Sequence, residues 1–104
     1  TYCVDHHVRG LRRALGDDAR AEVIAAALVA DRPEDALAGA ELARMRYAAR
    51  LTRTPAAVDA GDVAALRDAG LDDGAILELN QVVAYFAYAN RTVLGLGVTT
   101  DGER

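Results

Sequence analysis

The sequence predicts an all-α protein, because several features indicate helices and none indicates a strand. Apolar residues recur at intervals of three and four along most of the chain, which is the spacing of one helical face. Aspartate, proline and glycine residues that start and stop helices separate these stretches. No stretch shows the alternation of apolar and polar residues, with a period of two, that a half-buried strand requires. We therefore expect a compact helical bundle, a single domain over residues 1–104.

The first helix is predicted to begin at about residue 2 or 3 and to end at Leu15. Its apolar residues have the spacing of a buried face: Val4, Val8, Leu11 and Leu15. Gly16 then stops the helix, and Asp17 and Asp18 supply a fresh N-cap for a second helix over about 19–30. That second helix contains the run VIAAALVA and is apolar on nearly every side, so we expect it to be buried.

A third helix is predicted to begin near Pro33, because proline suits the first position of a helix. Glu34 and Asp35 follow it and suit the positive end of the helix dipole. We expect this helix to run to about Leu51, where the segment TRTP breaks it.

The last two helices are separated by Gly70, a natural residue just beyond a helix end. A short helix is predicted over about 61–69, and Asp72 is expected to cap the final long helix. Leu71 before this cap and Ile76 four positions after it match a hydrophobic staple. The apolar stripe of the long helix is Ile76, Leu79, Val83 and Phe86, and the helix is expected to loosen at GLGV.

The composition predicts a thin core. Apolar residues make up 52% of the chain, but much of this is alanine, and there is one Phe, one Met and no Trp. Alanine buries little apolar area, and burial contributes only about 25 cal/mol per Å². We therefore expect part of the stability to come from partner subunits or from chain outside this sequence.

Charge and apolar run length exclude two classes of partner. The net charge of -4 argues against nucleic acid, because phosphate binding needs clustered positive charge. The longest apolar runs, VIAAALVA and VVAYFAYA, are far shorter than the roughly 20 residues that span a bilayer. A single cysteine excludes an internal disulfide framework, so we expect a reducing, cytoplasmic compartment.

The only cysteine and both histidines lie in the first seven residues, TYCVDHH. If Cys3 lies in the first helical turn, His7 is on the same face, about 5–6 Å away between Cβ atoms. This spacing allows a hydrogen bond between thiol and imidazole, and a helix start favours a thiolate over a thiol. His6 points about 100° away and is not placed to share this role. Cys3 and His7 are therefore the candidate catalytic residues.

Two other interpretations of these residues remain. A lone cysteine is often a small buried hydrophobe, which would make Cys3 structural. A metal site is disfavoured, because Cys3, His6 and His7 cannot converge on one ion from a regular helix. No other cysteine or histidine exists to complete a coordination shell, so we expect no metal.

Aromatic and amide side chains are expected to have structural roles. We interpret the following as core and interface aromatics: Tyr47, Tyr85, Phe86 and Tyr88. Asn80 and Asn90 lie on an otherwise apolar helix and need hydrogen-bond partners if they are buried.

Four blocks occur in a characteristic order: YCVDHH, YAARLTRTPAAV, DVAALRDAGLDDGAILEL and VVAYFAYANRTVLGLGV. This order resembles the alkylhydroperoxidase D-like family, and most closely its peroxidase-related enzyme group within the carboxymuconolactone decarboxylase superfamily. The three later blocks cover about half of the chain and together are fairly specific, whereas the spacing of Cys3 and His7 alone is common.

The family motif is Cys-x-x-Cys-x-x-x-His at the start of a buried helix. The resemblance implies that Cys3 matches the second cysteine, which attacks the peroxide, and that His7 matches the histidine of the proton relay. The family's first cysteine would fall immediately ahead of Thr1, and its relay glutamate lies further upstream. We therefore expect this chain to be the C-terminal part of a longer protein, so that the helical bundle is incomplete at its N-terminus.

The resemblance implies a thiol-dependent peroxidase that reduces hydroperoxides without a cofactor, using an external dithiol as reductant. It also implies an all-α homo-oligomer. Alternatives on the same fold are a non-catalytic helical oligomerisation module and a redox sensor in which oxidation of Cys3 is a signal. A lactone decarboxylase is less favoured, because that branch does not depend on the cysteine pair.

Overall fold

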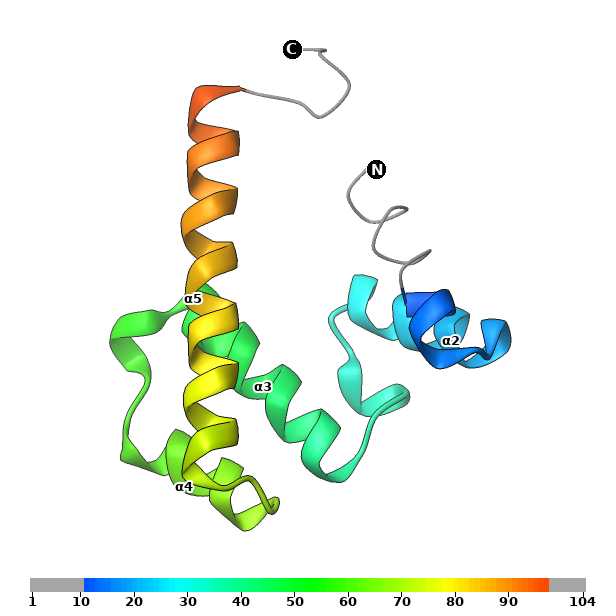
Figure 1. Cartoon of the computed structure of the whole chain (residues 1–104), viewed down its shortest axis with the longest axis horizontal. Coiled ribbons are helices and arrows are strands. Elements are labelled where there is room, and N and C mark those ends of the chain that lie inside the picture. The colour runs from blue at the N-terminus through cyan, green and yellow to red at the C-terminus, as the bar shows by residue number, and fades with distance from the viewer. Residues whose placement is uncertain (1–10, 98–104) are drawn as a thin grey trace. The chain divides into compact units, whose positions relative to one another are not determined.

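The computed structural model describes residues 11–97, and within that range every regular element is a helix, with no strand (Figure 1). Residues 11–15 are helical. The elements that follow are α2 (Asp18–Val29), η1 (Pro33–Asp35), α3 (Gly39–Arg53), η2 (Pro55–Ala57), α4 (Ala60–Asp68) and α5 (Asp73–Leu96), where η marks a 3₁₀ turn. The predicted all-α fold class is confirmed.

The chain divides into two compact units, Thr1–Leu42 and Ala43–Arg104, with the boundary in the first turn of α3. Within the first unit, α2 packs against η1. Within the second unit, α4 packs against α5 and lies beside its N-terminal end (Figure 1).

The end of the first helix and the start of α2 are as predicted. The helix ends at Leu15, and Gly16 adopts a φ of +64°, a left-handed conformation that glycine reaches without strain. Asp17 caps α2, and its side chain accepts a hydrogen bond of 3.1 Å from the backbone N–H of Arg20. Leu15 is exposed, however, so it does not lie on a buried face. The predicted positions before residue 11 lie outside the described residues.

The expectation that α2 is buried on nearly every side is wrong. Only its Ala21, Ile24 and Ala27 face is buried. The other face carries exposed large apolar side chains: Val23, Leu28 and Val29. The physical reason is that η1, which packs against α2, is a turn of three residues and covers only one side of the helix.

The third helix begins later than predicted. Pro33 opens the separate turn η1, and the Pro33 carbonyl accepts hydrogen bonds from the N–H groups of Ala36 and Leu37. α3 begins only at Gly39, which has a φ of +59°. A helix cannot continue through a left-handed residue, so η1 and α3 are separate. At its other end α3 continues to Arg53, two residues beyond the predicted end, and the TRTP segment then breaks it.

α4 is capped reciprocally. The Asp59 carboxylate accepts hydrogen bonds from the N–H groups of Gly61 and Asp62, at 2.9 and 3.3 Å. The Asp62 carboxylate accepts one from the N–H of Asp59 at 2.9 Å, which completes a capping box. The helix stops within one residue of the prediction, and Gly70 follows with a φ of +101°.

α5 starts and ends where the sequence predicts. The Asp72 side chain accepts a hydrogen bond of 2.8 Å from the N–H of Ala75, and the preceding Leu71 is buried. The helix ends at Leu96, and Gly97 caps it in the left-handed conformation, inside the GLGV segment. Phe86 departs from the prediction, because this stripe residue is exposed.

The core is small, as the alanine-rich composition predicts. Among the described residues, the first unit buries Ala21, Ile24, Ala27 and Leu37, and the second buries Tyr47, Leu66 and Leu71. Tyr47 is the only aromatic residue in this set. Leu66 is its most deeply buried large side chain, at 1% exposure. Each unit therefore depends on a few apolar contacts.

Candidate functional site

The predicted catalytic pair, Cys3 and His7, lies outside the described residues, as does His6. The described part of the chain begins at Leu11, in the helix that the sequence predicts to carry the pair, and this helix ends at Leu15. The spacing of Cys3 and His7 therefore stays a prediction from the sequence.

No alternative metal centre occurs among residues 11–97. No three acidic side chains there come close enough together to hold a metal ion. Since all cysteine and histidine residues lie at positions 3, 6 and 7, this part of the chain offers carboxylates alone.

Arg50 connects three elements of the second unit. Its Nε donates a hydrogen bond of 3.0 Å to Asp62 on α4, and its guanidinium also donates one of 2.9 Å to the carbonyl of Ala57 in η2. Asp62 is held from a second side by the N–H of Asp59, and this hydrogen bond is the largest cause that lowers the pKa of the Asp62 carboxyl. The positive charge of Arg50 lowers that pKa further. These groups satisfy one another, so we assign them a structural role.

Tyr47 and Asn80 connect α3 to α5. Tyr47 is 7% exposed, and its hydroxyl accepts a hydrogen bond of 3.1 Å from the side-chain amide of Asn80. The side-chain amide of Gln81 in turn donates a hydrogen bond of 3.1 Å to the side-chain oxygen of Asn80. The expectation that Tyr47 is a core residue is confirmed, and the half-buried Asn80 has the partner that its position requires. Asn90 is exposed.

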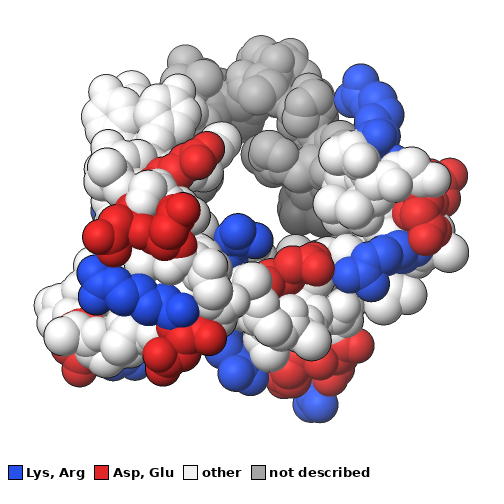
Figure 2. Space-filling model, turned by 60° about the horizontal axis from the view of Figure 1, so that its bottom comes forward, with Lys and Arg blue, Asp and Glu red and all other residues white. Residues whose placement is uncertain are grey.

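Charged side chains of both signs are interspersed on the face drawn in Figure 2. Ion pairs account for part of this pattern, including Arg67 with Asp73 at 3.2 Å and Arg32 with Asp35 at 2.8 Å. Both pairs are exposed to solvent, and exposed ion pairs add little to stability. Within residues 11–97 no helix combines the length and the apolar character that crossing a membrane requires.

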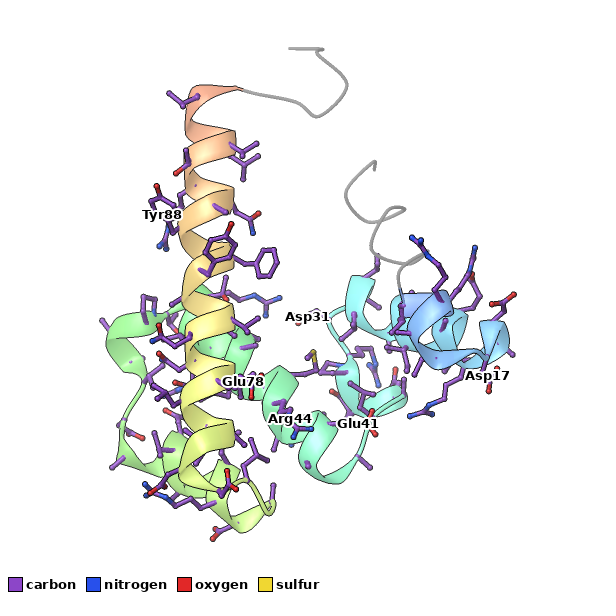
Figure 3. All side chains as sticks on the ribbon, in the orientation of Figure 1. Asp17, Asp31, Glu41, Arg44, Glu78 and Tyr88 are labelled. Carbon is purple, nitrogen blue, oxygen red and sulfur yellow. The ribbon has the colours of Figure 1, made fainter. Side chains whose placement is uncertain are left out.

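α5 carries the largest group of exposed apolar side chains on any described element (Figure 3). They are Leu77, Val82, Tyr85, Phe86, Tyr88, Val93, Leu94 and Leu96. Between residues 76 and 96 only Glu78 and Arg91 are charged. The rings of Tyr85 and Phe86 stand edge to face, with centroids 5.4 Å apart. Sequence reasoning identified these aromatics as core or interface residues, and their exposure leaves the interface as the role to test.

Comparison with protein-family models, with curated proteins and with solved structures found no match. The likeness to the alkylhydroperoxidase D-like family therefore rests on the four sequence blocks. The structure independently supports the broader fold class, which is all-α.

Proposed function

We propose that the protein is a thiol-dependent peroxidase in which Cys3 reduces a hydroperoxide with the help of His7. The observation that carries this proposal is the sequence YCVDHH, in which a histidine follows the only cysteine by four residues. On a helix this spacing brings the two side chains to one face. An imidazole at that distance can accept the thiol proton and so raise the fraction of reactive thiolate.

The proposed reaction begins when His7 takes the proton of the Cys3 thiol. The thiolate sulfur attacks the terminal oxygen of the hydroperoxide, and the oxygen–oxygen bond breaks. Cys3 becomes a sulfenic acid, and the alcohol leaves with the proton that His7 returns. A second thiol then condenses with the sulfenic acid, which forms a disulfide and releases water. An external dithiol reduces this disulfide and is itself oxidised, so no cofactor or metal takes part.

The partners that follow from this reaction are a hydroperoxide substrate and a dithiol reductant. A reducing, cytoplasmic compartment would keep Cys3 in its thiol form between turnovers. We also propose that the protein acts as a homo-oligomer, which would supply the apolar contacts that its thin core lacks.

The proposal is tested by mass spectrometry of the full chain after brief exposure to a stoichiometric hydroperoxide. We expect Cys3 to gain one oxygen, or to form a disulfide if a second thiol is supplied. His7→Ala should slow this oxidation, by up to about 30-fold at pH 7, because a free thiol of pKa about 8.5 is only about 3% ionised there. His6→Ala is the matched control and should react at the wild-type rate.

The outcomes separate the alternatives on this fold. Oxidation that depends on His7 and turns over with a dithiol supports the peroxidase. Oxidation that depends on His7 without turnover would make the protein a redox sensor. A Cys3 that reacts no faster than a free thiol, and equally in both histidine variants, would contradict the proposal and leave a non-catalytic helical module.

A further inference from the structure

We draw no further inference here: the strongest candidate, the exposed apolar face of α5 that includes Val82, Tyr85 and Phe86, carries no proposal, because nothing in the described residues shows what covers it.

Discussion

Leu66 provides the sharpest test of how the second unit is held together. It lies on α4, which packs against α5, and it is the largest side chain among the described residues that is fully buried, at 1% exposure. Leu66→Ala removes three buried carbon atoms, worth about 2.4 kcal/mol at 0.8 kcal/mol each. The cavity left behind adds to this, so we expect a loss of about 3 kcal/mol.

Such a loss is large for this protein. Domains of this length have a free energy of unfolding of about 5–15 kcal/mol, and the thin core places this one toward the lower end. The assay is urea unfolding followed by circular dichroism, comparing wild type, Leu66→Ala and Leu77→Ala. Leu77 is 61% exposed on α5, so its truncation should change the free energy of unfolding by less than about 0.5 kcal/mol. A loss below about 1 kcal/mol for Leu66→Ala, or equal losses in both variants, would refute the packing described here.

Three further predictions concern polar contacts of the second unit. Tyr47→Phe removes the acceptor of the Asn80 amide and should lower the free energy of unfolding in urea by about 0.5–1.5 kcal/mol. The same change should have little effect in an Asn80→Ala background, and fully additive losses of the two substitutions would contradict the contact. Asp59→Ala removes the cap of α4 and should lower the free energy of unfolding by about 1 kcal/mol. Asp59→Asn should preserve most of the stability, because asparagine also caps helices, and equal losses in the two variants would argue against capping. The pKa of Asp62 is lowered on folding from its ordinary value of 3.8, so its stabilising effect is present above that pH and is lost as the pH falls through the lower, folded value. Asp62→Asn should therefore flatten the loss of stability below about pH 4, and an unchanged acid slope would contradict this.

Local signals explain what the sequence predicted well. Asp17 and Asp72 were identifiable as caps because each acts on a backbone N–H three residues away, within a single helical turn. Gly70 marked a helix end for the same reason, since its φ of +101° suits glycine. Pro33 misled the prediction, because proline followed by acidic residues suits a 3₁₀ turn as well as an α-helix. The left-handed conformation of Gly39, which separates the two elements, has no distinctive sequence pattern.

Burial and long-range contacts were harder to predict, because they depend on which elements meet. The run VIAAALVA predicted a fully buried α2, but a helix is buried only where a neighbour covers it, and η1 covers one face. Arg50 and Asp62 lie twelve residues apart on different elements, so no local spacing indicated their ion pair. For the candidate site, the spacing of Cys3 and His7 is itself a local signal, which is why the chemistry could be proposed from sequence.

The most direct test of the proposed function is the pH dependence of the rate at which Cys3 reacts with a hydroperoxide in the full chain. A free thiol reacts about tenfold faster for each pH unit up to pH 8.5, because only the thiolate is the nucleophile. If His7 assists ionisation, the wild-type rate should change little between pH 7 and 8.5, whereas the His7→Ala rate should rise steeply. Parallel, steep profiles for both proteins would contradict the account and make Cys3 an ordinary thiol.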